Sequence, residues 1–201
     1  GLQVNWSAFI NPDFITPQLL DLMQRAGCDA IEFGTDSGSP AMLTSLCKSF
    51  TLGQVRSASL LCREAGLDFA HYIIFGGPGE TEETILDTFQ LMDELNPTAV
   101  IAMTGVRIYP RTRLYRTALD EGLITVETDL LQPTFYLAPA IKDKLSTIVT
   151  EQAMQRKNWI VPGLEVNISD TMLEALRMFK VRGPLWKLLK RMGRSRIAPM
   201  K

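Results

Sequence analysis

Apolar runs of strand length alternate with amphipathic segments of helix length along the first 124 residues. The runs predict strands at residues 4–9, 30–34, 68–75 and 99–109, and the intervening segments predict helices at 17–27, 41–47, 51–65, 84–95 and 113–121. Strands separated by helices at intervals of about 30 to 40 residues are typical of right-handed βαβ units. The pattern therefore predicts an α/β fold with a parallel sheet and about four βα units.

Four such units are compatible both with half of a TIM-type barrel and with an open doubly wound sheet. The strand-like start of the chain at Gly1, without an initiator Met, favours the half-barrel and suggests that the sequence is part of a longer one. In both architectures, ligands collect at the carboxyl ends of the strands. These ends are Asp36-Ser37, 76–80 and 108–111, which we expect to lie on one rim.

The pattern changes after residue 124, so a barrel part at 1–124 and a helical extension at 125–201 are predicted, with helices at 141–157 and 169–179. Residues 180–201 contain eight Lys or Arg and no acid. In a helix, one face of this tail would be apolar and the opposite face basic. The apolar positions are Leu185, Leu188, Leu189 and Met192, and the basic ones are Lys187, Lys190, Arg191 and Arg194. The tail is expected to dock on the body of the protein or to contact a membrane surface or a partner.

The stretch 67–83, LDFAHYIIFGGPGETEE, joins a predicted buried strand to an acidic helix through Gly76, Gly77 and Gly79. Such a turn commonly binds phosphate, because free N–H groups and the helix dipole attract an anion. Here Glu80 and two further glutamates are expected in the first helical turn, where they would repel a phosphate, and no Gly-Lys-Ser/Thr follows. The loop therefore predicts a neutral or zwitterionic ligand held by backbone groups.

The composition is that of a soluble globular protein, with 46% hydrophobic and 21% charged residues. No uncharged apolar run reaches the roughly 18 residues of a membrane span, so a cytoplasmic location is expected, and the basic tail leaves membrane association open. Nothing indicates nucleic-acid binding. Three widely spaced cysteines, Cys28, Cys47 and Cys62, fit neither a disulfide framework nor a metal site and are interpreted as buried thiols. The single histidine, His71, is interpreted as a core or supporting residue rather than a catalytic one.

Three segments in this order and spacing resemble successive parts of radical S-adenosylmethionine (radical SAM) enzymes. They are IEFGTDSGS at 31–39, IIFGGPGETEET at 73–84 and VRIYPRTRLY at 106–115. The preceding segment VNWSAFINPDFITPQLLDLMQRAG resembles the third strand-helix unit of that family's partial barrel, especially in its cobalamin-binding branch. The resemblance covers about 4–122, and it implies that this chain is the carboxyl-terminal part of such an enzyme.

The resemblance implies a set of S-adenosylmethionine-binding residues. Asp36 takes the place of a glutamate in the family's turn and would face the amino or ribose groups, together with Ser37 and Gly38. Ile74 would pack on the adenine, and the glycines after it would admit the nucleoside. The backbone of Ile108 and Tyr109 would contact the adenine edge, and Arg107 would reach the methionine carboxylate or a substrate. The full set is Asp36, Ser37, Gly38, Ile74, Gly76, Gly79, Glu80, Arg107, Ile108 and Tyr109.

The CxxxCxxC loop that holds the family's 4Fe-4S cluster is absent from the sequence. The resemblance therefore implies that the cluster ligands lie upstream, that cobalamin is a further candidate cofactor, and that no metal ligand belongs to this segment. The implied reaction is C–H functionalisation or methylation of a hydrophobic or lipid-like small molecule, and the sequence identifies no catalytic residue. The alternatives are a non-catalytic partner-binding module and a different βα-barrel enzyme.

Overall fold

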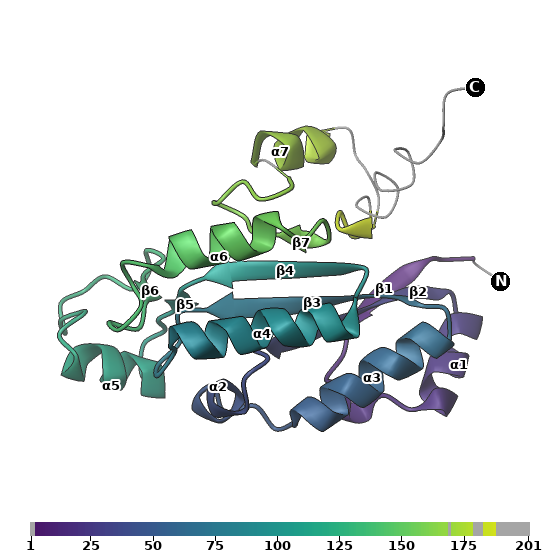
Figure 1. The fold of residues 1–201 in the computed structure, drawn as a ribbon, viewed down its shortest axis with the longest axis horizontal. Coiled ribbons are helices and arrows are strands. Elements are labelled where there is room, and N and C mark those ends of the chain that lie inside the picture. Colours follow the sequence, from purple (N-terminus) through teal and green to yellow (C-terminus); the bar gives the residue numbers. More distant parts are fainter. Residues whose placement is uncertain (1–2, 169, 179–182, 188–201) are drawn as a thin grey trace.

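A computed structural model describes residues 3–168, 170–178 and 183–187, and every structural statement below concerns these residues. Its main sheet has five parallel strands in the order β1-β2-β3-β4-β7 (Figure 1). The strands are β1 (Trp6–Phe9), β2 (Cys28–Asp36), β3 (Asp68–Phe75), β4 (Ala99–Thr104) and β7 (Trp159–Ile160). The predicted α/β fold with four parallel βα units is confirmed, and the sheet has one strand more than predicted.

The helices follow the predicted segments closely. They are a short 3-10 helix at Pro12–Phe14, then α1 (Pro17–Arg25), α2 (Pro40–Ser45), α3 (Leu52–Glu64), α4 (Glu82–Leu95), α5 (Arg113–Asp120), α6 (Leu145–Met154) and α7 (Asp170–Met178). Local capping explains several starts. At the start of α1, the side chain of Thr16 accepts a hydrogen bond from the Leu19 N–H, and Pro17 is the first helical residue. Thr51 and Thr81 form capping boxes at the starts of α3 and α4.

The fourth predicted strand, 99–109, is interrupted at Gly105. This glycine has φ 86°, and its N–H donates to the carbonyl oxygen of Phe75 at 2.7 Å. A positive φ turns the backbone out of the parallel sheet, and glycine adopts it without a Cβ clash. After the turn, β5 (Val106–Arg107) leaves the main sheet and pairs in antiparallel fashion with β6 (Phe135–Tyr136).

The fifth strand, β7, lies in the predicted helical extension, between its two predicted helices, where no strand is predicted. It pairs with β4 through Val100 and Ile101. Its Trp159 is fully buried and stacks on Phe89 of α4, with ring centroids 4.1 Å apart. The helix predicted before it is shorter than expected, because α6 spans only Leu145–Met154. A two-residue strand has no readable periodicity, so only its tertiary pairing reveals it.

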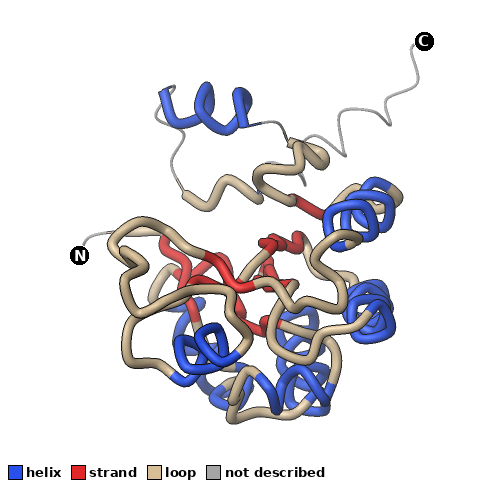
Figure 2. Tube along the Cα trace, turned by 90° about the vertical axis from the view of Figure 1, so that its left-hand side faces the viewer, coloured by secondary structure: helices blue, strands red, loops and turns tan. Residues whose placement is uncertain are grey.

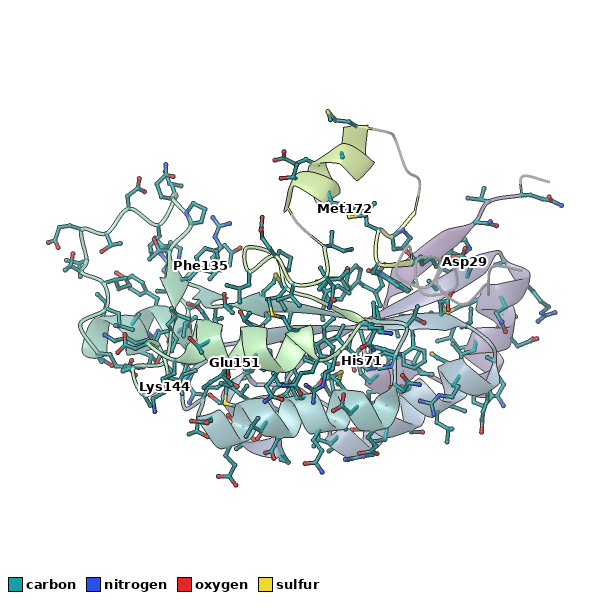
Figure 3. The ribbon with its side chains drawn as sticks, turned by 45° about the horizontal axis from the view of Figure 1, so that its top comes forward. Asp29, His71, Phe135, Lys144, Glu151 and Met172 are labelled. Carbon is teal, nitrogen blue, oxygen red and sulfur yellow. The ribbon has the colours of Figure 1, made fainter. Side chains whose placement is uncertain are left out.

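The two faces of the sheet are covered by different parts of the chain. Helices α3, α4 and α6 lie on one face, which we call the outer face, whereas α7 lies on the opposite, inner face (Figures 1 and 2). His71 and Met172 mark these two faces in Figure 3. We call the part of the inner face near the amino ends of the strands the lower inner face, and the part near their carboxyl ends the upper inner face. The lower inner face is apolar and is covered by the carboxyl-terminal segment. Its buried cluster consists of Ala30, Ala70, Ala99, Ile160, Ile168 and Trp186, with Ile101 and Met172 packed against it.

The described end of the basic tail docks on the inner face. The indole N–H of Trp186 donates to the buried carboxylate of Glu32 at 3.2 Å, and the hydroxyls of Tyr72 and Ser7 donate to the same carboxylate. Lys187 forms an ion pair with Asp29 at 2.7 Å. Residues 184–187 of the tail therefore dock on the body of the protein. The remaining positions of the predicted amphipathic helix, Leu188, Leu189, Lys190, Arg191, Met192 and Arg194, lie outside the described residues. No helix within the described ranges is long and apolar enough to cross a membrane.

Replacing Trp186 with Phe is expected to lower the free energy of unfolding by about 1 to 2 kcal/mol, because a hydrogen bond to a buried carboxylate is lost. Urea unfolding of the chain measures the difference. The matched control is Trp6→Phe, which removes the indole bond to the carbonyl oxygen of Ala26 at a more exposed site. Equal, small losses in both variants would show that the Glu32 contact does not hold the tail.

Candidate functional site

The three turns singled out in the sequence lie on one rim of the sheet. They follow β2, β3 and β5, and the carboxyl ends of β3 and β4 point toward β5 and β6 in Figure 1. Neighbouring turns are bonded to one another: the Ser45 hydroxyl, at the end of α2, donates to the carbonyl oxygen of Pro78 at 2.5 Å. A Cβ on Gly77 would lie 3.1 Å from side-chain atoms of both Leu46 and Met42. The predicted rim is therefore a packed structure.

Glu80 organises the glycine-rich loop from within. Its carboxylate accepts the N–H groups of Gly76 at 2.5 Å and Gly77 at 3.2 Å, and its side chain is 1% exposed. Gly76 and Gly79 have φ values of 99° and 83°, so the turn requires glycine at both positions. Burial raises the pKa of the Glu80 carboxyl to about 7, although the two N–H bonds oppose this shift.

This arrangement corrects two expectations about the loop. Glu80 precedes the Thr81 cap and turns back into the loop, so only Glu82 and Glu83 lie in the first turn of α4. The N–H groups of Gly76 and Gly77, which the sequence offered to a ligand, are occupied by this internal carboxylate. Gly79 differs from them, because a Cβ there would meet no atom within 4 Å. The free side of the loop is therefore at Gly79.

Asp36 lies at the carboxyl end of β2, next to an irregularity in the pairing with β3. The register shifts between Gly34 and Asp36, and Asp36 has φ 63°. Its carboxylate accepts a bond from the ammonium group of Lys48 at 2.6 Å, and both side chains are about four-fifths buried, at 19% and 20% exposed. Lys48 also lies over the Phe50 ring, with Nζ 5.4 Å from the centroid. The rim thus presents Asp36 as a neutralised ion pair.

Ser37 and Gly38 are buried against α4. The Gly38 N–H donates to the Thr88 hydroxyl at 2.9 Å, and the Ser37 hydroxyl lies 3.2 Å from the same oxygen. A Cβ on Gly38 would lie 2.6 Å from the Cα of Thr88, so glycine is needed for this close approach. In this structure both residues fix the turn to the helix layer.

The upper inner face, above the cluster around Trp186, remains open. A Cβ on Gly34 would meet no atom within 4 Å, and its register partner is Tyr72. Two residues further along β3, Ile74 is only partly buried, and its partner Met103 on β4 is 42% exposed. These residues border an apolar surface directly below the glycine-rich rim. Ile74 therefore lies where a flat apolar group can contact it.

The segment 107–109 has divided roles. Ile108 is buried, and its N–H donates to the carbonyl oxygen of Thr134 at 2.8 Å. The Tyr109 carbonyl oxygen accepts the Thr112 hydroxyl at 2.8 Å, while the Tyr109 side chain is 53% exposed. The Arg107 guanidinium lies 5.0 Å from the Tyr109 ring centroid. The Ile108 N–H and the Tyr109 carbonyl oxygen therefore already have protein partners.

His71 has the supporting role that the sequence predicts. It is fully buried between Thr35, 2.7 Å from Nδ1, and Ser59, 3.1 Å from Nε2. Ser59 donates its own hydroxyl hydrogen to the Val55 carbonyl oxygen, so it accepts from Nε2–H, and Nδ1 accepts from Thr35. Burial lowers the pKa of His71 to about 3. The imidazole is therefore a neutral bridge between β2 and α3.

The cysteines form no metal centre. Cys28 and Cys62 are buried, and burial raises the pKa of the Cys62 thiol to about 12. Cys47 is exposed, with φ 55°, which corrects the expectation of three buried thiols. In the part of the chain that the structure describes, no group of three or more His, Cys, Asp or Glu residues could hold a metal ion. These residues do not fit an iron–sulfur cluster.

The first half of the chain matches the model of a known protein family. Residues 4–92, which include β1 to β3 and most of α4, match the model of the Radical SAM superfamily. Over these residues, the chain is similar to the radical SAM superfamily. The match includes the Asp36 turn and the glycine-rich loop, and ends before Arg107.

Two curated relatives are methyltransferases. The chain is 28% identical over 124 residues to an uncharacterized methyltransferase of Pyrococcus horikoshii, which covers 62% of this chain and 27% of that protein. It is 26% identical over 126 residues to the tryptophan 2-C-methyltransferase of Streptomyces laurentii, covering 59% of this chain and 21% of that protein. The chain thus spans about a quarter of the length of these relatives.

Two solved structures have a similar fold. The methyltransferase TsrM of Kitasatospora setae, with cobalamin and a [4Fe-4S] cluster bound, superposes with a TM-score of 0.72 at 18% identity, covering 94% of this chain and 44% of that one. The archaeal Elp3 of Methanocaldococcus infernus has a TM-score of 0.60 at 16% identity, covering 89% and 43%.

Two residues of this rim are not singled out by the sequence pattern. Lys48 neutralises Asp36. It is the single basic residue between Asp36 and Phe50, so it is the nearest candidate in the following sequence for an ion pair with Asp36. Gly34 borders the open upper inner face, and its position two residues before Asp36 in a buried strand was a possible sign of close ligand approach.

Proposed function

We propose that this chain forms part of the barrel of a radical SAM methyltransferase that acts on a hydrophobic or lipid-like small molecule. The observation that carries the proposal is the open upper inner face, where Gly34, Ile74 and Met103 form an apolar surface below the rim of a radical SAM domain. Ligands of parallel barrels bind at this end of the strands. The methyltransferase names of the curated relatives support methylation as the reaction.

S-adenosylmethionine is the cofactor that this surface would hold. Ile74 and Met103 supply an apolar floor for the adenine, and Gly34 leaves room for the nucleoside. The Asp36–Lys48 pair offers polar atoms at the edge of the same surface. When bound to a reduced 4Fe-4S cluster, S-adenosylmethionine supplies the radical chemistry, with cobalamin as a candidate methyl carrier, as bound in TsrM. The cluster ligands would come from residues outside this chain.

The residues of this chain then orient the cofactor and exclude water. Glu80 holds the glycine-rich loop in one conformation through the N–H groups of Gly76 and Gly77. Trp186 and its neighbours close the lower inner face, so the open space is limited to the rim end. A preformed, one-ended apolar site suits chemistry that water would quench.

Replacing Gly34 with Leu tests this placement. Gly34 has no positive φ and no atom within 4 Å of a Cβ, so the variant is expected to fold with an unchanged midpoint of thermal unfolding. The leucine would occupy the nucleoside space and weaken S-adenosylmethionine binding by about tenfold or more, equivalent to about 1.4 kcal/mol. Calorimetry on the full-length protein measures the affinity.

The matched control is Gly122→Ala, at a glycine that also has open space around a Cβ but lies at the end of α5. Its φ of 68° makes a small loss of stability the expected result, with cofactor affinity unchanged. Normal S-adenosylmethionine affinity in a folded Gly34→Leu variant would exclude the upper inner face as the cofactor site.

A further inference from the structure

A cavity lies beside the two-stranded sheet of β5 and β6. It has a volume of about 470 Å³, which is typical of small-molecule sites. Its walls come from β5, the first turn of α5 and the loop between α5 and β6. The lining residues are Arg107, Tyr109, Pro110, Tyr115, Val126, Thr128, Asp129, Leu130 and Leu131. Arg107 and Tyr109 are shared with the site described above, whereas the other lining residues are not part of it.

Arg107 brings an unsatisfied donor to this cavity. Its Nε atom is buried and has no hydrogen-bond partner among the described residues. A buried N–H without an acceptor costs free energy, so such a group usually indicates a missing ligand or water. The guanidinium lies over the Tyr109 ring, and both residues line the cavity. A planar guanidinium stacked in this way still binds an acceptor through its edge.

The charges of the lining favour a monoanion. Asp129 is the acidic residue of the lining, and its carboxylate accepts the Leu131 N–H at 2.9 Å within its own loop. One arginine and one aspartate leave the lining close to neutral, so Asp129 repels a doubly charged phosphate more strongly than a singly charged carboxylate held by Arg107. A carboxylate also matches the guanidinium fork with two parallel bonds.

The remaining walls favour an apolar body attached to this carboxylate. Tyr109 and Tyr115 line the cavity, together with Leu131 and Val126, which are 88% and 72% exposed. Phe135, the register partner of Arg107, stands on the same side of the ribbon and is 53% exposed (Figure 3). Exposed apolar side chains gathered at a polar anchor indicate a ligand-binding or interaction site.

We propose that this cavity binds an apolar monocarboxylate, with the carboxylate on Arg107 and the apolar body between the tyrosines and Leu131. That this ligand is the substrate of the methylation rests on the proposed function. The carboxylate site itself does not depend on any cofactor. Arg107 is thereby assigned to the substrate rather than to the methionine carboxylate.

Calorimetric titration of the chain with 4-phenylbutanoate tests the cavity without cluster or S-adenosylmethionine. The carboxylate is expected to bind about tenfold or more tightly than the neutral amide of the same skeleton. Arg107→Gln should remove this difference, and Arg107→Lys should restore it only in part, because lysine keeps the charge and loses the fork. Arg116→Gln, at an exposed position of α5, is the matched control and should bind as the parent chain does.

Three outcomes would overturn the proposal. They are equal binding of acid and amide, an unaltered affinity in a folded Arg107→Gln variant, and tighter binding of phenyl phosphate than of the carboxylate. Folding is checked by the midpoint of thermal unfolding, which Arg107→Gln should lower only slightly, since its Nε has no hydrogen-bond partner and the contact with the Tyr109 ring is what is lost. A chain that binds 4-phenylbutanoate through Arg107, in a full-length protein that does not cleave S-adenosylmethionine, would retain the cavity and refute the proposed reaction.

Discussion

Replacing Trp159 with Ala is expected to lower the free energy of unfolding by about 4 kcal/mol, the range for removing a fully buried large aromatic side chain. Trp159 is 0% exposed and stacks on Phe89 with 4.1 Å between ring centroids, and the Phe75 ring lies 6.3 Å from Trp159 and 5.5 Å from Phe89. These rings join β7, α4 and β3. Loss of the Trp159 indole would leave a cavity at the point where α6 and α4 meet the sheet. Urea unfolding followed by circular dichroism measures the change.

Leu131→Ala is the control for this substitution, since Leu131 is 88% exposed and its truncation should change stability by less than about 0.5 kcal/mol. Trp159→Phe should lie between the two, because it keeps a ring in the stack. A loss of under about 1 kcal/mol in Trp159→Ala would mean that β7 is not an integral strand of the sheet.

Replacing Glu80 with Ala is expected to destabilise the chain by about 3 kcal/mol at neutral pH, because the buried N–H groups of Gly76 and Gly77 lose their shared acceptor. The loop should also become mobile, because the carboxylate that ties these two N–H groups together is removed. Hydrogen exchange at Gly76 and Gly77 measures the local effect, and chemical unfolding measures the global one. Glu83→Ala, in the exposed first turn of α4, is the matched control.

The same carboxyl predicts a pH dependence that Glu80→Gln should abolish. Burial raises its pKa from 4.5 in the unfolded chain to about 7 in the folded one. Between these values the folded state holds more protons than the unfolded state, so stability falls as the pH rises from about 4.5 to about 7. The total loss is on the order of 3 kcal/mol relative to Glu80→Gln, at about 1.4 kcal/mol for each unit of pKa difference. Parallel stability curves for parent and Gln variant between pH 4 and 8 would contradict the raised pKa.

The regular elements of this chain could be predicted because their signals are local. The run 68–75 is apolar on both faces and ends at Gly76, and β3 has these same bounds. Thr16-Pro17 and Thr51 start helices through bonds to residues three positions away. The turns of the rim could also be predicted, since parallel strands place their carboxyl ends on one edge, and three motifs in order identified the family before the fold was known.

The contacts that shape the site depend on residues far apart in the chain, and only the tertiary structure decided them. Lys48 meets Asp36 because a register shift in β2 turns the carboxylate toward it, and no local pattern encodes such a shift. Glu80 faces inward because two backbone N–H groups form a buried acceptor site for it, whereas its sequence context looks like an exposed helix start. Trp186 reaches Glu32 across 154 positions, and β7 is a strand only through its pairing with β4. Propensity and periodicity act over a few residues, while burial of polar groups, strand pairing and closure of the inner face are set by the whole chain.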